Sequence, residues 1–176
     1  MNRNSTRRAR RDAHTLDLFS TNDAPHDLAP TPRLEVPVFT LRLVRERSHE
    51  TAQVRTPADV ARLATELVAD LDREAFYVIA LSTANRVVGA HCAHLGTVDA
   101  SVASPREVYK FALLVNARSV VCLHNHPSGN TEPSRADIQI SKQIRAAGEA
   151  LGIPLVDSLV VGFDGRYTSL VERGLL

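Results

Sequence analysis

The apolar positions of this chain recur at two periods, one typical of α-helices and one typical of β-strands. Helical spacing predicts three helices, at about 56–70, 104–118 and 134–152. Apolar and β-branched runs predict strands at 36–44, 76–81, 87–95, 119–123, 154–161 and 167–170, and a weaker strand at 98–102. Because both hairpins and longer crossovers connect the strands, we expect an α/β fold with a mixed central β-sheet flanked by helices.

Each predicted helix begins with a residue that can cap it. Thr56, Ser104 and Ser134 are each followed, three positions later, by an acid, which is the spacing of a capping box. Pro57 and Pro105 suit the first helical position, where the missing N–H costs nothing. Local bonds between side chains and the backbone therefore predict where the helices begin.

Residues 1–33 differ in composition from the rest of the chain. They are rich in polar residues and proline and cannot bury enough apolar surface to offset the entropy lost on ordering. We therefore expect a disordered tail at 1–33 and one domain at 34–176. The tail carries a basic cluster that either contacts nucleic acid or stays solvated: Arg3, Arg7, Arg8, Arg10 and Arg11.

The composition narrows the class of protein further. Hydrophobic residues make up 44% of the chain, which is enough for a core, and no apolar run is long enough to span a membrane. The net charge of +1 argues neither for nor against a nucleic-acid partner. Cys92 and Cys122 lie in apolar segments without a CxxC spacing, so we expect reduced thiols in a cytoplasmic protein, and no cysteine-based zinc site.

One stretch carries most of the candidate chemistry: the end of the strand at 119–123 with the loop and helix that follow. His124 and His126 are two positions apart, so in a strand both side chains project to the same side. Asp137 lies in the first turn of the next helix, after a loop that contains glycine and proline. Two imidazoles and a carboxylate are a typical set of three protein ligands for a catalytic metal.

Each half of this pattern also has an ordinary explanation. A pair of histidines at this spacing can be structural, and Ser134 with Asp137 is by itself a capping box. The metal site is favoured because the histidines end a strand predicted to be buried, where a polar side chain without a partner is costly.

The spacing of these residues resembles a known motif. His124-x-His126-Pro127, followed after six residues by Ser134-x-x-Asp137, is similar to the JAMM motif of the JAB/MPN metalloprotease superfamily. With the strings ASPREVYKFALLVNA and YTSLVERGLL, residues from about 55 to 176 look like the RadC branch of that superfamily, the RadC-like JAB domain. The resemblance implies a three-layer, cytidine-deaminase-like arrangement and a zinc ion held by His124, His126 and Asp137. It also implies that Ser134 binds near the zinc-bound water or a developing oxyanion.

The resemblance further implies a glutamate base at the junction between the first helix and the first central strand. Glu74 occupies that junction and is our choice for the base. Glu107 is the alternative candidate for the base. Its position three residues after Ser104 is, however, also explained by a capping box at the start of that helix.

Some features stand outside the resemblance. Many RadC-type proteins carry an N-terminal helix-hairpin-helix module, and we expect none in this sequence. Related sequences often have Asp-His after the last helix, where this chain has Asp157-Ser158; Asp157 either orients a ligand histidine or caps a strand end. His91 and His94 fall in a hairpin strand and are not expected to be ligands.

These observations lead to one main hypothesis and two alternatives. The main hypothesis is a zinc-dependent, peptidase-like hydrolase with a peptide or protein substrate, in which Glu74 moves the proton. The first alternative is a DNA-associated repair or mobile-element accessory protein that uses the basic cluster of the tail. The second is a non-catalytic scaffold, which the intact set of metal ligands argues against.

Overall fold

The computed structural model describes residue 40 and residues 52–68, 71–96 and 103–176. The predicted tail with its basic cluster and the predicted strand at 98–102 lie outside the described residues, as does the predicted strand at 36–44 apart from Thr40.

The described residues form a single five-stranded mixed sheet with three helices. The strand order is β2-β1-β3-β4-β5; β3 and β4 are parallel and every other neighbouring pair is antiparallel. In chain order, the elements are α1 (Pro57–Val68), β1 (Ala75–Leu81), β2 (Val87–Leu95), α2 (Pro105–Leu114), β3 (Ser119–Asn125), α3 (Arg135–Leu151), β4 (Leu155–Val161) and β5 (Tyr167–Ser169). The predicted α/β class with a mixed sheet is confirmed.

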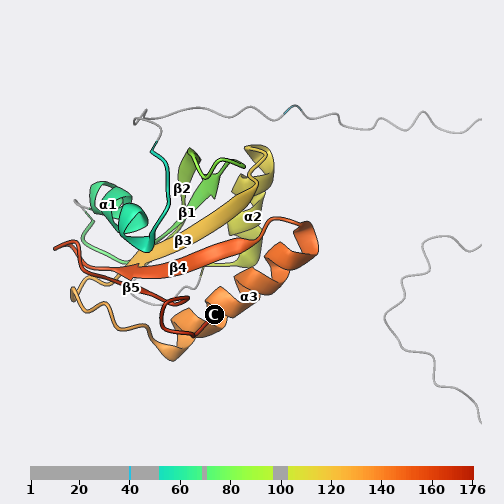
Figure 1. Ribbon diagram of the computed structural model, residues 1–176. Coiled ribbons are helices and arrows are strands. Elements are labelled where there is room, and N and C mark those ends of the chain that lie inside the picture. Colours follow the sequence, from blue (N-terminus) through green and yellow to red (C-terminus); the bar gives the residue numbers. More distant parts are fainter. Residues whose placement is uncertain (1–39, 41–51, 69–70, 97–102) are drawn as a thin grey trace, which may run out of the picture. The chain divides into compact units, whose positions relative to one another are not determined.

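Helices cover both faces of the sheet (Figure 1), which gives three layers. On one face, Val78 and Val120 pack with α2 and with Ile144 of α3. On the other face, Val121 and Leu159 pack with the buried side of α1. Because side chains alternate along a strand, even-numbered positions of β1 and β3 face α2 and α3, and odd-numbered positions face α1.

The predicted caps start all three helices. The Asp59 carboxylate accepts the backbone N–H groups of Arg55 and Thr56, each at 2.9 Å, and these bonds lower the pKa of Asp59 to about 2. Ser134 and Asp137 form a complete capping box at the start of α3. Gly152 ends that helix in the left-handed conformation, with φ of 68°, which glycine adopts without strain.

The predicted end of α2 was too late. The helix stops at Leu114, four residues before the predicted 118, and Asn116 adopts a left-handed φ of 51°. Asparagine tolerates this conformation better than most residues, and it turns the chain from α2 into β3.

The described residues have two further features. Cys122 is buried, Cys92 is half-buried, and neither forms a disulfide. Within the described residues, no helix combines the length and the apolar character that a membrane span needs.

Candidate metal centre

The central strand β3 delivers the two histidines to the sheet end nearest the start of α3. All seven residues of β3 are buried, because the strand lies between β1 and β4 and is covered on both faces. The His124 side chain is 2% exposed, whereas that of His126, just beyond the strand, is 18% exposed. The His124 ring stacks on Phe76 of β1, with centroids 5.8 Å apart, so the core holds its orientation.

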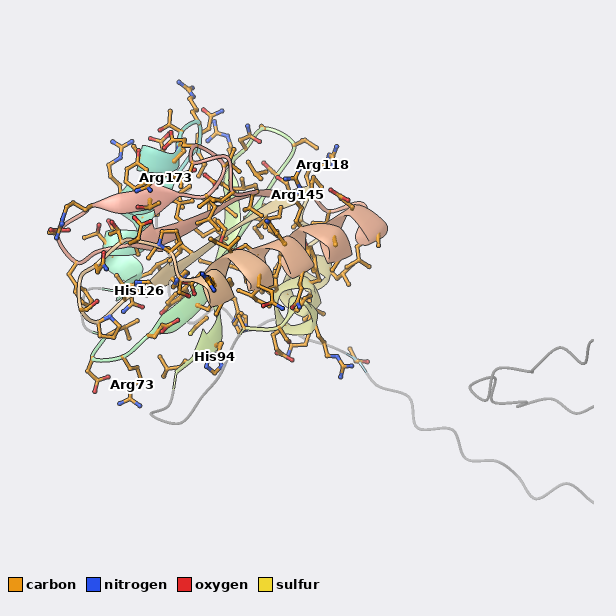
Figure 2. The ribbon with its side chains drawn as sticks, turned by 90° about the horizontal axis from the view of Figure 1, so that it is seen from below. Arg73, His94, Arg118, His126, Arg145 and Arg173 are labelled. Carbon is orange, nitrogen blue, oxygen red and sulfur yellow. The ribbon has the colours of Figure 1, made fainter. Side chains whose placement is uncertain are left out.

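Asp137 approaches the histidines from the first turn of α3. Its Oδ1 lies 3.4 Å from Nε2 of His124, and its Oδ2 lies 3.5 Å from Nε2 of His126. The two Nε2 atoms are 3.2 Å apart, and Figure 2 shows His126 beside the N-terminal end of α3. The structure therefore brings together all three predicted ligands, with one ligand atom from each within 4.8 Å of the others.

Hydrogen bonds orient the cluster. Nδ1 of His126 lies 2.7 Å from the carbonyl oxygen of Asn130, and because a carbonyl only accepts, this nitrogen carries the hydrogen. Nε2 of His126 then presents a lone pair toward Asp137 and His124. A ligand histidine held by a backbone carbonyl through its second nitrogen is the usual arrangement around protein-bound metals.

The donor set fits a metal ion. Nδ1 of His124 is buried and has no hydrogen-bond partner in the part of the chain that the structure describes. If this Nδ1 carries the hydrogen, two Nε2 lone pairs and a carboxylate converge on one point, and a cation there offsets their mutual repulsion. If Nε2 of His124 carries the hydrogen instead, its Nδ1 is a buried acceptor that receives no hydrogen bond. The three converging ligand atoms are thus a group that can hold a metal ion.

The electrostatics of Asp137 favour its charged form. Burial by itself would raise the pKa of this carboxyl group, but a charged His124 that donates from Nε2, the form that cannot offer this nitrogen to a metal, and the hydrogen bonds of Ser134 outweigh burial. The pKa of Asp137 therefore lies well below its usual range, and the carboxylate is available as an anionic ligand at neutral pH.

Ser134 serves first as the N-cap of α3. Its Oγ accepts the N–H of Asp137 at 3.2 Å, while its own N–H donates to Oδ2 of Asp137 at 2.7 Å. This capping bond uses a lone pair of the hydroxyl and leaves the hydroxyl hydrogen able to donate. The cap also holds the hydroxyl beside one of the three ligands.

Glu74 lies immediately before β1, at the end of the sheet where the histidines lie. Phe76 pairs with His124 in the antiparallel register of β1 and β3. Continuing the alternation of β1 by one step places Glu74 on the face that Phe76 shares with His124. The residue is exposed, so its side chain faces solvent rather than the core.

Glu107 has a different set of partners. Its backbone N–H donates to Oγ of Ser104, as the predicted cap requires, and its carboxylate pairs with Lys110 one turn further along α2. The hydrogen bond from Lys110 lowers the pKa of Glu107. Glu107 thus takes part in local contacts of α2.

Two other histidines predicted not to be ligands lie on β2, outside the three-residue cluster. His91 stacks on Phe111 of α2, with centroids 5.2 Å apart. The side chain of His94, labelled in Figure 2, belongs to the same strand.

Asp157 contacts the C-terminal segment rather than a ligand histidine. It shares the α1 face of the sheet with Leu159, whereas His124 faces α3. Its Oδ2 accepts the hydroxyl of Ser169 at 2.6 Å, and its Oδ1 accepts the N–H of Val171 at 3.2 Å. Of the two roles considered for Asp157, these contacts favour capping a strand end, and they fix the turn that follows β5.

Replacing Asp157 with alanine is expected to destabilise the fold without affecting the metal centre. The hydroxyl of Ser169 and the N–H of Val171 lose a buried acceptor, which costs about 1–3 kcal/mol. Chemical denaturation measures this loss, and metal content is measured on the same sample. Glu172→Ala, at an exposed position of the same segment, is the control and should change the free energy of unfolding by less than about 0.5 kcal/mol. If Asp157→Ala loses the metal and keeps its stability, Asp157 supports the metal centre rather than the turn after β5.

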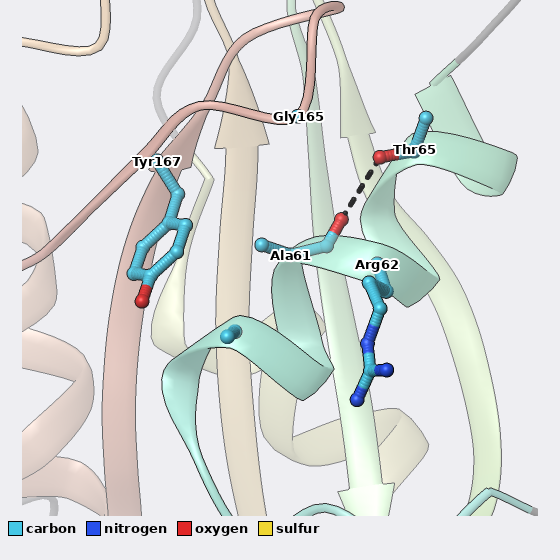
Figure 3. A pocket seen from close by; sticks show the side chains of 6 residues that line it. Ala61, Arg62, Thr65, Gly165 and Tyr167 are labelled. Atoms are coloured by element: carbon cyan, nitrogen blue, oxygen red, sulfur yellow. Dashed lines mark hydrogen bonds between the residues drawn. The ribbon is translucent and has the colours of Figure 1, made fainter.

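A cavity among the described residues lies away from the cluster. It has a volume of about 420 Å³ and is lined by α1 and by the segment that contains Gly165 and Tyr167 (Figure 3). Tyr167 belongs to the apolar cluster that packs on α1, whereas the histidines lie on the α3 face. The candidate metal centre at the end of the sheet is therefore distinct from this cavity.

The fold and the cluster define a class of protein: a three-layer α/β domain that presents two histidines and an aspartate at one end of its sheet. Within that class, the chain belongs to the RadC-like JAB domain family, whose model matches residues 54–175.

Curated relatives agree with this assignment. The chain is 46% identical over 132 residues to a UPF0758 protein of Salinibacter ruber, a match that covers 75% of this chain and 56% of the relative. It is 43% identical over 133 residues to a UPF0758 protein of Shouchella clausii, with 76% of this chain and 57% of the relative covered. The matched part of the chain thus spans little more than half of these relatives, and their names state no activity.

Proposed function

We propose that the chain is a zinc-dependent hydrolase that cleaves a peptide or isopeptide bond with an activated water molecule. The observation that carries the proposal is the convergence of His124, His126 and Asp137 within 4.8 Å. Two imidazoles and one carboxylate are the ligand set of many catalytic zinc sites, which keep a position open for water or substrate. When bound, zinc supplies a Lewis acid that polarises a carbonyl and lowers the pKa of a water to about 7.

Glu74 and Ser134 supply the remaining chemistry. Glu74 accepts a proton from the attacking water, whose oxygen bonds to the carbonyl carbon. The hydroxyl of Ser134 donates a hydrogen bond to the oxyanion that develops on the carbonyl oxygen. The C–N bond then breaks, and Glu74 passes the proton to the departing amine, so that water is divided between a carboxylate product and an amine product.

The open position of the site supports a macromolecular substrate. His126 and Asp137 are partly exposed, with 18% and 14% of their side chains accessible, and Glu74 is exposed. An extended peptide can reach such a surface site without entering a closed pocket. The nucleic-acid alternative remains a prediction, because its arginines lie outside the described residues.

A peptide-library experiment tests the proposal. Purified protein is stripped with a chelator, reloaded with Zn²⁺, and incubated with a mixed peptide library and with isopeptide-linked peptides, and mass spectrometry identifies the products. We expect new termini with the zinc-loaded protein and none with the metal-free protein. A zinc-loaded protein that is fully folded and cleaves neither class of substrate would contradict the proposal.

A further inference from the structure

Asn125 is a buried amide between the two histidines. It is the last residue of β3 and has no exposed surface. Because side chains alternate along the strand, its side chain leaves the face that carries His124 and His126. Asn125 is therefore not placed to bind a metal, and a buried polar group at this position needs another explanation.

The Asn125 side chain binds the backbone on both sides of Glu74. Its Oδ1 accepts the N–H of Ala75 at 2.9 Å, and its Nδ2 donates to the carbonyl of Arg73 at 3.0 Å. The last backbone pair between β1 and β3 is Phe76 with His124. Through these two bonds, the Asn125 side chain extends the contact between β1 and β3 beyond the Phe76–His124 pair, to the backbone next to Glu74.

A second contact, from the end of β2, holds the peptide unit between Glu74 and Ala75. The N–H of Gly96, directly after β2, donates to the carbonyl of Glu74 at 2.7 Å. A Cβ atom at position 96 would lie 3.1 Å from that carbonyl oxygen, which is tighter than ordinary contact. Glu74 therefore has a backbone fixed from two strands and a side chain exposed to solvent.

We infer that Asn125 is the positioning residue for Glu74 and that it couples the base to the metal ligands. This inference rests on the proposed function, in which Glu74 moves the proton. Asn125 is bonded covalently to both histidines and through hydrogen bonds to both neighbours of Glu74. The amide supplies both the acceptor and the donor that the two contacts require, whereas an ionised carboxylate cannot donate and an alkyl group can do neither.

Asn125→Leu tests the inference, because it keeps the number and branching of the side-chain heavy atoms and removes both hydrogen bonds. The matched control is Ser158→Ala, which removes one buried hydrogen bond, to Ser141 at 2.9 Å, from the neighbouring strand β4. Gly96→Ala is a second variant. Its added methyl group would crowd the carbonyl oxygen of Glu74 from the end of β2 without changing any residue of β3.

The first measurement needs no substrate. The protein and its variants are loaded with Co²⁺, and NMR records the paramagnetic shifts of the backbone amides. In Asn125→Leu and Gly96→Ala, the shifts of Glu74 and Ala75 should change, while both variants still bind one metal per chain. In Ser158→Ala these shifts should stay as in the wild type. Wild-type shifts at Glu74 and Ala75 in folded, metal-loaded Asn125→Leu would overturn the inference.

The second measurement is a double-mutant cycle on hydrolysis of a peptide found in the library experiment. Asn125→Leu should lower kcat on the order of 10²-fold, as expected when a reacting group is displaced by about 1 Å, and leave KM nearly unchanged. In a Glu74→Gln background the same change should have no further effect. An equal loss in both backgrounds would overturn the inference and leave the proposed function standing. A wild-type protein that binds no Co²⁺ would instead overturn both.

Discussion

Alanine in place of His124 is expected to remove the metal from the protein. The wild type should bind about one zinc per chain at a site with three protein ligands, and the variant keeps only two. The affinity should fall by more than the 10–100-fold that changes outside the ligand shell produce. Elemental analysis of the purified protein measures the metal content, and hydrolysis should be lost with it.

Asp137→Ala should give the same loss of metal together with a loss of stability. The change removes the carboxylate that also accepts the N–H of Ser134 in the capping box. Loss of a cap contact costs about 1 kcal/mol, which thermal unfolding detects. His91→Ala is the matched control, because His91 stacks on Phe111 and lies outside the cluster. A His124→Ala or Asp137→Ala protein that keeps one zinc per chain would contradict the ligand assignment.

Glu74→Gln is expected to keep the metal and lose hydrolysis. Glutamine preserves the size of the side chain and cannot accept and return a proton, so kcat should fall by about 10²–10⁴-fold, the usual contribution of general acid–base catalysis. Metal content and thermal stability should match the wild type, because the Glu74 side chain is exposed and its backbone contacts are unchanged. Elemental analysis, thermal unfolding and steady-state kinetics measure these three properties.

Glu107→Gln is the matched control for this variant. The Glu107 carboxylate pairs with Lys110 on the surface of α2, and removing such an exposed pair should leave the stability nearly unchanged. Its kcat should equal that of the wild type. If Glu107→Gln abolishes hydrolysis and Glu74→Gln leaves it intact, the base is Glu107.

Glu74 and Asn125 link the metal centre to the remainder of the sheet. In the proposed mechanism, the position of the base depends on a contact between residues 50 positions apart in the sequence. A substitution at Asn125 should therefore affect catalysis while the ligands themselves are unchanged. This separates two ways of inactivating the protein, loss of the metal and displacement of the base.

Local interactions made much of the fold predictable from the sequence. The starts of the three helices followed from cap residues that bind backbone groups at most four positions away, as Thr56 does with Asp59 and Ser134 with Asp137. The end of α2 was less predictable, because it depends on Asn116 adopting a left-handed conformation, which asparagine tolerates but does not require. Apolar runs likewise indicated the strands, although not their order in the sheet.

The candidate metal ligands could be named from the sequence, since His124 and His126 share a face at strand spacing and Asp137 lies in the first turn of the next helix. Their surroundings came only from the folded arrangement of the strands. The pairing of β1 with β3 brought Glu74 to the histidine end of the sheet and gave Asn125 its two backbone partners, and the pairing of β4 with β5 brought Asp157 to Ser169. Helix caps depend on neighbours in the chain, whereas strand register depends on burying both faces of the whole sheet. A shift of register by one residue would move every side chain of a strand to the opposite face.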